Sequence, residues 1–398
     1  MGGIKVNDVQ NISATPVVIT STTVIGVVGT AFLVNVSDEI KAALADESKA
    51  GLLRFSDAEE ALEVFKDSVG TLREDLYDIK MQNVKSPIII SLVELTEEES
   101  ANSHFDFYGN DEIKTKILTA LDNLKLAKTV HATKVRLPLV GWFTHDKTVL
   151  DALTSYLVGS KTIGVANLNA RNVSEALTAL MELASDRYLI APFYRKVWST
   201  FDNAYIEKPY SAIIAGHIAF WDAKYDGGFG PCFDHANRAI FNMGDCVVPL
   251  FYQEGEDTCD VNIITNAGGC LCINDEVMGN ILYNFETPSD DERFNKLETM
   301  RYFDLINEEC QLALVKHKHR PVTQVLDLAR ADIEAFLLKS KKAGATVGFD
   351  VWWSDRNTAT DISAGILYLD YKASNNVGVR TIVLQAYATS EYYTIETN

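Results

Sequence analysis

The sequence lacks the features that would place this protein in a membrane or on nucleic acid. None of its apolar runs approaches the 18 residues that suggest a transmembrane helix. The first ten residues, MGGIKVNDVQ, contain no apolar core of a signal peptide. Positive charge is scarce, because 36 Lys and Arg face 55 Asp and Glu, for a formal net charge of −19. Nucleic-acid-binding surfaces are basic, so this acidic chain is not expected to bind nucleic acid. Since it lacks a signal peptide core and a long apolar run, we expect a protein that is made in a reducing cytoplasm and spans no membrane.

The cysteine spacings of a disulfide framework or a structural zinc site are also missing. The six cysteines are irregularly spaced in a long chain, unlike those of small disulfide-rich domains. Cys232 with His235, and Cys270 with Cys272, suggest metal ligands, but neither pair has the Cys-x2-Cys spacing of structural zinc. We therefore expect no metal and no other cofactor. We expect buried thiols instead, at Cys232, Cys246, Cys259, Cys270, Cys272 and Cys310.

No complete nucleotide-binding or nucleophile motif is present. Gly26 and Gly29 supply half of a dinucleotide-binding loop, but the third glycine is missing and no helical pattern follows at once. The run TVIGVVGTA, from Thr22, is therefore predicted to be an apolar strand. The chain has neither a P-loop nor a nucleophile elbow at its strand ends. These absences predict that the protein is not an enzyme.

From Pro87 onward, apolar segments alternate with amphipathic ones. Strands that are apolar on both faces predict a parallel sheet covered by helices, which is an α/β arrangement. The expected strands are 88–95, 136–143, 162–167 and 188–193, and the expected helices are 112–127, 147–158 and 173–184.

An α/β enzyme remains the alternative for this region. Its ligand would bind beyond the carboxyl ends of the strands. His145 and Asp146, however, also fit the N-cap region of the following helix. The polar residues in the positions of such a site are Thr144, His145, Asp146, Asn167, Asn169, Arg171 and Arg195.

Charge is unevenly distributed along the chain. Residues 37–112 hold 19 Asp and Glu against 7 Lys and Arg, and the amphipathic segment 57–69 predicts a helix there. We interpret this region as the solvated face of an outward-facing lobe. Residues 299–344 hold 8 Lys and Arg against 6 Asp and Glu and predict two helices joined before Pro321. The second of these helices ends in a group of basic residues, Lys339, Lys341 and Lys342.

The C-terminal end alternates apolar and polar residues with a period of two. Residues 366–371 (ILYLDY) and 380–388 (RTIVLQAYA) therefore predict strands. The eight residues 372–379 between them are polar and contain glycine, and they exceed what a tight hairpin needs. The last strand therefore either joins the chain's own sheet after a loose loop or pairs with another subunit by β-augmentation.

These segments together resemble the contractile tail sheath proteins of phages with contractile tails and of R-type bacteriocins. The resemblance includes the strand after Thr22, a Gly-Thr-Leu step at Gly70 and the two-helix unit at 299–344. It is strongest near the C-terminus, where a glycine precedes a Trp with a nearby Asp and Asn, and an Ala-Gly pair opens a strand ending in Asp-Tyr. The positions that match this pattern are Gly348, Trp352, Asp355, Asn357, Ala364, Gly365, Asp370, Tyr371, Glu391 and Tyr392. Residues 270–274, Cys-Leu-Cys-Ile-Asn, depart from the Leu/Trp-Gly-x-Arg-Thr segment that the family usually has near its later glycine-rich turn.

The resemblance implies an α/β (α+β overall) fold with a mixed-sheet core domain, exchanged terminal arms and an outer α/β lobe. The implied boundaries are an N-terminal arm at 1–23, a core at 24–36 and 240–371, the outer lobe at 37–239, and a linker and arm at 372–398. The inter-subunit arm residues would be Val17, Val18, Ile19, Thr381, Ile382, Val383, Leu384, Gln385, Ala386 and Tyr387. The hinge linker would contain Ser374, Asn375, Asn376 and Gly378. The surface facing the tail tube would contain Lys339, Lys341 and Lys342, although a basic helix terminus that complements the helix dipole explains these lysines equally well.

The function that the resemblance implies is mechanical. Arms of neighbouring subunits would add strands to each core sheet, and stacked hexamers would form a helical sheath around a tail tube. Contraction to a more stable lattice would drive the tube through a cell envelope without consuming nucleotide. The implied partners are further copies of the chain, the tube protein, and baseplate and terminator proteins, in a virion tail assembled in the host bacterial cytoplasm. The sheath of a bacteriocin or another bacterial injection device is the alternative.

Overall fold

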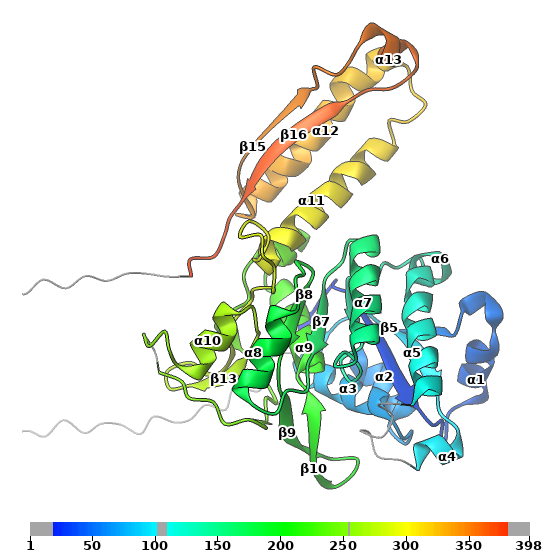
Figure 1. Cartoon of the computed structure of the whole chain (residues 1–398). Helices are drawn as coiled ribbons and strands as arrows, with labels where there is room; N and C mark the ends of the chain where they lie inside the picture. The colour runs from blue at the N-terminus through cyan, green and yellow to red at the C-terminus, as the bar shows by residue number, and fades with distance from the viewer. Residues whose placement is uncertain (1–18, 102–109, 254, 381–398) are drawn as a thin grey trace, which may run out of the picture.

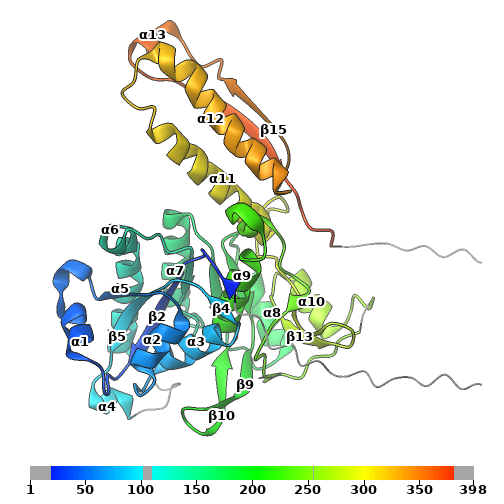
Figure 2. The ribbon, with the colours of Figure 1, turned by 180° about the vertical axis from the view of Figure 1, so that it is seen from behind.

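The chain folds into two parts, which we call the body (residues 19–296) and the rod (residues 297–375). The computed structural model describes residues 19–101, 110–253 and 255–380. Figures 1 and 2 show from two sides how the rod projects from the body. The described residues form three apolar clusters: two lie on the two faces of the body's main sheet, and the third lies in the rod and also includes Phe229 and Cys232 of the body.

A six-stranded sheet forms the centre of the body, with strand order β3-β5-β2-β6-β7-β8. Five of its strands are parallel, and β3 pairs antiparallel with β5 at the edge. The parallel strands carry side chains that are buried on both faces, as the continuous apolar runs predict. The strands are β2 (Ile25–Ala31), β3 (Leu52–Phe55), β5 (Ile88–Glu94), β6 (Leu137–Leu139), β7 (Gly164–Asn167) and β8 (Tyr188–Ala191).

Helices cover both faces of this sheet, which confirms the predicted layering. On one face α5 (Asp111–Asn123), α7 (Lys147–Ser160) and α8 (Val173–Met181) contribute to the apolar cluster. On the other, α2 (Ala58–Phe65), α3 (Thr71–Lys80) and α9 (Ser211–Asp222) do so.

Shorter elements complete the body. β9 (Tyr194–Ser199) and β10 (Ala204–Pro209) form an antiparallel hairpin that also pairs with β12 (Asp245–Cys246). A second small sheet has the strand order β11-β14-β13. The remaining elements of the body are β1 (Ile19–Thr20), α1 (Asp38–Ala45), β4 (Val84–Lys85), α4 (Glu97–Ser100), α6 (Ala127–His131), β11 (Arg238–Ala239), α10 (Asp260–Asn266), β13 (Cys272–Asp275), β14 (Gly279–Leu282), and the 3-10 turns 47–49, 124–126, 226–228 and 230–232.

The rod consists of two long helices and a β-hairpin. The helices α11 (Leu297–Val315) and α12 (Val322–Lys342) pack against each other, and α12 also packs against β15 (Thr346–Trp353). β15 pairs with β16 (Leu369–Asn375), and α13 (Ala359–Ser363) lies in the connection between them. Both long helices were predicted from their apolar stripes, and the buried core of the rod lies along those stripes at Ile306, Cys310, Ala329, Ile333 and Leu337.

The packing of the elements divides the chain at other positions than the predicted domain boundaries do. β2, within the predicted core segment 24–36, is a central strand of the body's sheet because it pairs with both β5 and β6. The predicted core segment 240–371 divides near Leu297, since Cys270, Leu282 and Phe285 pack in the body's apolar cluster. Residues 24–36 therefore pack with the predicted outer lobe 37–239 rather than with the rod.

The buried helix α9 makes stability depend on pH. His217 on α9 is buried, and burial together with the neighbouring His235 lowers its pKa from 6.5 to about 3. Because the unfolded chain binds this proton more readily than the folded protein, stability falls as pH drops below about 6.5. The effect is at most about 1.4 kcal/mol per pH unit. We expect His217→Gln to flatten this slope in urea unfolding between pH 7 and pH 4. Equal slopes for the variant and the wild type would contradict the assignment.

Candidate assembly interface

The β15–β16 hairpin is the part of the rod best suited to bind another chain. Val351 pairs with Tyr371 and Phe349 with Ala373, and these residues pack toward the apolar cluster of the rod. This packing against α12 stabilises a two-stranded sheet that would be marginal by itself. The alternation of buried and exposed residues from Phe349 to Trp352 follows the period of two that defines a strand.

The other face and both edges of this hairpin are open. Val347 and Trp352 are 59% and 39% exposed. Within the described residues, the sheet contains β15 and β16 alone, so each strand presents an outer row of backbone N–H and C=O groups. Such an edge is a template for pairing with another strand. The charged residues of the two strands are Asp350, Asp370 and Lys372; Asp350 pairs with Lys372 at 2.9 Å, and Asp370 pairs with Arg356 at 2.8 Å.

The linker after this hairpin is shorter than predicted. Residues 372–375 continue β16, with Ser374 opposite Gly348 and Asn375 opposite Thr346. The predicted linker therefore begins four residues too early, because the apolar spacing ends at Tyr371 while the backbone ladder continues to Asn375. Of the predicted hinge residues, Asn376 and Gly378 lie beyond the end of β16.

The predicted arm residues fall mostly outside the described residues. Thr381 to Tyr387 lie there, as do Val17 and Val18. Ile19 is described, and it lies in β1, which pairs in parallel with β4 of the same chain through Val84. The inter-subunit role of these segments stays a prediction.

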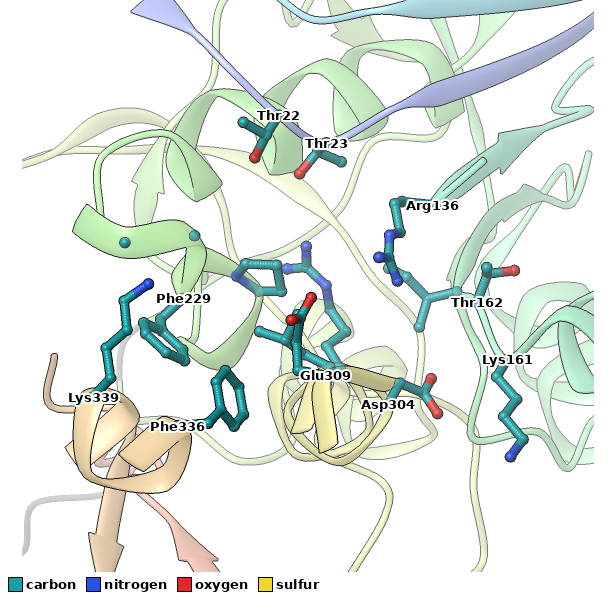
Figure 3. Close-up of a pocket in the computed structure, with 16 residues that line it drawn as sticks. Thr22, Thr23, Arg136, Lys161, Thr162, Phe229, Asp304, Glu309, Phe336 and Lys339 are labelled. Atoms are coloured by element: carbon teal, nitrogen blue, oxygen red, sulfur yellow. The ribbon is translucent and has the colours of Figure 1, made fainter. Parts of the chain in front are cut away.

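The three candidate tube-facing lysines lie in the last turn of α12, at the end of the rod nearest the body. Lys339, Lys341 and Lys342 are all exposed. Their position at the helix C-terminus fits the dipole interpretation. Lys339 differs from the other two, because its ammonium lies 5.8 Å from the ring centroid of Phe229 in the body. Figure 3 shows Lys339, Phe229 and Phe336 lining one side of a cavity of about 400 Å³ between body and rod.

Ion pairs along α11 join the rod to the body. Asp304 accepts two hydrogen bonds from Arg187, at 2.5 and 3.3 Å. Glu308 is contacted by Lys134, at 3.0 Å, and by Arg136. These residues are 13–35% exposed at their side chains, so water screens the pairs only in part.

A more deeply buried ion pair lies at the start of the same helix. Arg301 donates to Asp222 at 2.5 Å, and His235 contacts the other oxygen of Asp222 at 2.8 Å. Burial opposes ionisation of Asp222, but Arg301 and His235 outweigh it and hold the pKa of Asp222 below its usual value. Body and rod are therefore connected by a row of charge contacts rather than by a flexible linker.

Most of the polar residues at the carboxyl ends of the body's strands have structural partners, whereas the buried side-chain oxygen of Asn169 accepts no hydrogen bond from the described residues. Asn167 accepts from the backbone N–H groups of Tyr210 and Ser211 and so fixes the start of α9. Asp146 caps α7 by accepting from the backbone N–H groups of Thr148 and Val149, as predicted. Burial lowers the pKa of His145 to about 4. Arg195 is buried in an ion cluster, Arg171 pairs with Glu207 at the surface, and Thr144 bonds to the backbone of Asn167.

Sequence reasoning missed a buried ion cluster between α3 and the β9–β10 hairpin. Lys208 lies 2.7 Å from Glu74 and 2.9 Å from Asp78, and Arg195 also pairs with Asp78. All four side chains are at most 2% exposed. Their nearest sequence signal is the acidic run at 74–78 in a helix that also carries Leu76 and Ile79. In the sequence alone, such an acidic run indicates a solvated face.

The described residues contain no cluster of three or more His, Cys, Asp or Glu side chains with metal-binding geometry. Buried thiols are confirmed at five of the six cysteines, whereas Cys246 is only partly buried. Burial raises the pKa of Cys232 and Cys310 to about 12. Among the helices that the structure describes, none is long and apolar enough to cross a membrane.

The chain is similar in sequence and in fold to known sheath proteins. No protein-family model matches the chain. A putative prophage major tail sheath protein of Pseudomonas aeruginosa (strain UCBPP-PA14) is 27% identical over 229 residues. This match covers 56% of the chain and 55% of the relative, so it spans about half the length of each.

Two of the solved structures that match this chain do so over nearly their whole length. One is the PVC sheath complex of an extracellular contractile injection system in the contracted state, with a TM-score of 0.65, 13% identity and 98% coverage of both chains. The other is the helical sheath of the anti-feeding prophage in the contracted state, with a TM-score of 0.63, 15% identity, and coverage of 97% of this chain and 99% of that chain. The chain therefore has the fold of contractile sheath subunits, and the predicted resemblance and mixed α/β fold class are confirmed.

Proposed function

We propose that the protein is the structural subunit of a contractile tail sheath, which polymerises around a tail tube and contracts to drive that tube through a cell envelope. The observation that carries the proposal is the match to two contracted sheath subunits over 97% or more of the chain, body and rod together. Sequence similarity to a prophage tail sheath protein supports it independently of the fold.

In this proposal the open edges of the β15–β16 hairpin receive strands from neighbouring copies. The donated strands are the predicted arms, at residues 17–19 and 381–387. Backbone hydrogen bonds provide the affinity, and each net contribution is about 0.5–1.5 kcal/mol. Several arms per subunit then connect stacked hexamers into a continuous mesh.

Contraction in this mechanism uses conformational energy stored at assembly. The subunits first assemble in a metastable extended lattice and then rearrange into a more stable contracted one, with the arms still paired. The ion pairs along α11 support movement of body and rod as one unit, because each of Arg187, Lys134 and Arg136 in the body contacts a carboxylate of the rod. The proposal requires neither nucleotide nor cofactor.

The partners follow from the same proposal. They are other copies of the chain, the tube protein, and the baseplate and terminator proteins at the ends of the sheath. We place the assembly in the cytoplasm of a bacterial host and the finished sheath on a virion tail. The sheath of a bacteriocin or another injection device is the second candidate, which the similarity to an extracellular contractile injection system favours.

Purified protein tests this proposal directly. We expect the chain to form tubes without nucleotide, observed by sedimentation and negative-stain electron microscopy. Stoichiometric nucleotide binding at micromolar affinity, combined with a failure to polymerise under any salt condition, would contradict it and favour the α/β enzyme.

The lysines at the end of α12 are expected to affect tube binding through charge alone. Reversal of Lys341 and Lys342 to Glu should weaken docking on an acidic tube at low salt while leaving stability nearly unchanged, because exposed charges contribute little to folding. Lys339→Glu is assayed separately, since Lys339 also contacts Phe229. Lys318→Glu, at the far end of the rod, is the control. Co-sedimentation with tubes that is unchanged at low and high salt would identify these lysines as a helix terminus only.

A further inference from the structure

The segment that follows β16 is bound along the junction of rod and body. The backbone N–H of Asn376 donates to Ala345 at 3.0 Å, and its side-chain amide donates to Gly344 at 2.9 Å. Asn375 donates to Thr299 on α11 at 2.8 Å. Gly378 lies against the side chain of Asp234 in the body, so closely that an added Cβ would lie 2.9 Å from its carboxylate oxygen. Residues 375–380 therefore form a strap that contacts both parts of the molecule.

The strap ends in a group of three carboxylates. Arg380 donates to both oxygens of Glu298, at 3.1 and 3.0 Å, and also pairs with Glu286 at 2.8 Å and Asp234 at 3.4 Å. The three acidic residues come from separate segments, which are the loop after 3-10 turn 230–232, the loop after β14, and the first turn of α11. The guanidinium group can satisfy several carboxylates at once because its five N–H donors form a planar fork.

The burial of these groups makes the contact more than a surface ion pair. The side chain of Glu298 is 0% exposed and that of Arg380 is 21% exposed. Burial raises the pKa of Glu298, and Arg380 opposes that shift. Without a cation, three carboxylates would face one another at the junction, one of them fully buried, and such an arrangement is unfavourable. The charge of the site therefore selects a cationic side chain.

We propose that Asp234, Glu286 and Glu298 form a guanidinium-binding socket that holds Arg380 of the same chain and so anchors the root of the C-terminal arm. Under the proposed sheath function, on which only this consequence rests, the arm leaves its own subunit at Arg380 rather than at Lys372. Tension on the arm then reaches the junction of body and rod through Arg380. Of the predicted hinge residues, Asn375, Asn376 and Gly378 then lie in a fixed strap, and Ser374 lies in β16.

Trypsin provides the test, because it cleaves after arginine and must take the arginine side chain into its own pocket. We expect slow cleavage of the Arg380–Thr381 bond in dilute, unassembled protein, followed by mass spectrometry. Glu286→Gln and the double variant Asp234→Asn/Glu286→Gln should accelerate this cleavage by about tenfold or more, as should 1 M NaCl, since salt screens partly exposed pairs. Glu334→Gln, which removes the exposed partner of Arg330, is the matched control and should change nothing.

A second variant pair tests the strap without altering charge. Gly378→Ala places a Cβ against Asp234 and should release the strap and accelerate cleavage at Arg380. Gly348→Ala, where an added Cβ meets nothing within 4 Å, should not. Circular dichroism and the thermal midpoint of each variant show whether it is folded.

Two results would overturn the proposal. One is cleavage at Arg380 that is equally fast in the wild type and in the folded socket variants. The other is protection that appears only at concentrations where the chain polymerises, which would assign the socket to an arginine of a neighbouring copy. Because the assay uses unassembled protein, its outcome is independent of whether the chain forms a contractile sheath.

Discussion

Deletion of residues 381–398 is expected to abolish polymerisation while leaving a folded subunit. The deletion begins after Arg380, so that the buried Glu298 keeps its partner. A single strand pairing is weak, because each hydrogen bond contributes about 0.5–1.5 kcal/mol net and association costs roughly 4–15 kcal/mol. The lattice forms because each tether raises the effective concentration of the next pairing. Loss of one arm per subunit should therefore prevent assembly rather than weaken it slightly.

Sedimentation and circular dichroism of the truncated chain measure this outcome. Deletion of residues 394–398 alone, beyond the predicted last strand and the Glu-Tyr-Tyr segment that follows it, is the control and should still allow tubes to form. Tubes like those of the wild type from the longer deletion would show that the last strand is not exchanged. An unfolded product would show that it belongs to the subunit's own core.

The second large effect, a loss of stability, is expected when Lys208 in the body is replaced. Lys208→Met should lower the free energy of unfolding by about 3–5 kcal/mol, the usual effect of removing one partner of a buried ion pair. Glu74 would lose a contact at 2.7 Å and Asp78 one at 2.9 Å, in a site where these side chains are at most 2% exposed. Urea unfolding measures the difference.

Two further variants separate charge from packing at this site. Lys196→Met, on the neighbouring strand with an exposed side chain, should change stability by less than about 0.5 kcal/mol. Adding Glu74→Gln to Lys208→Met should recover part of the loss, because the unpaired carboxylate is removed. A Lys208→Met protein as stable as the Lys196→Met control would mean that the cluster contributes no net stability.

The long apolar patterns were sufficient to predict the layered part of the fold. The runs at 88–95 and 188–193 are apolar at nearly every position, which alone indicates a parallel sheet covered by helices. Most of their residues are buried in the structure. The stripes of α11 and α12 were recognisable in the same way, since Ile306, Cys310, Ile333 and Leu337 recur at helical spacing. Asp146 was recognisable as a cap because its position before a helix has a local meaning.

What the sequence did not predict depends on contacts between distant residues. Glu74 and Lys208 are 134 positions apart, and an acidic residue in a helix is usually solvated, so the pattern did not indicate a buried pair. Arg380 and Glu298 are 82 positions apart, so their pairing could not be predicted either. The extension of β16 to Asn375 also escaped prediction, since its polar side chains interrupt the apolar alternation while the backbone ladder continues.

The exchange of the C-terminal strand between copies is the central claim, and a high-resolution electron microscopy reconstruction of tubes in extended and contracted states tests it most directly. The account predicts two helical lattices, with continuous density from Arg380 of one subunit to an edge of the β15–β16 hairpin of a neighbouring copy in both. A single lattice, or a last strand that returns to its own subunit's hairpin in both states, would contradict it.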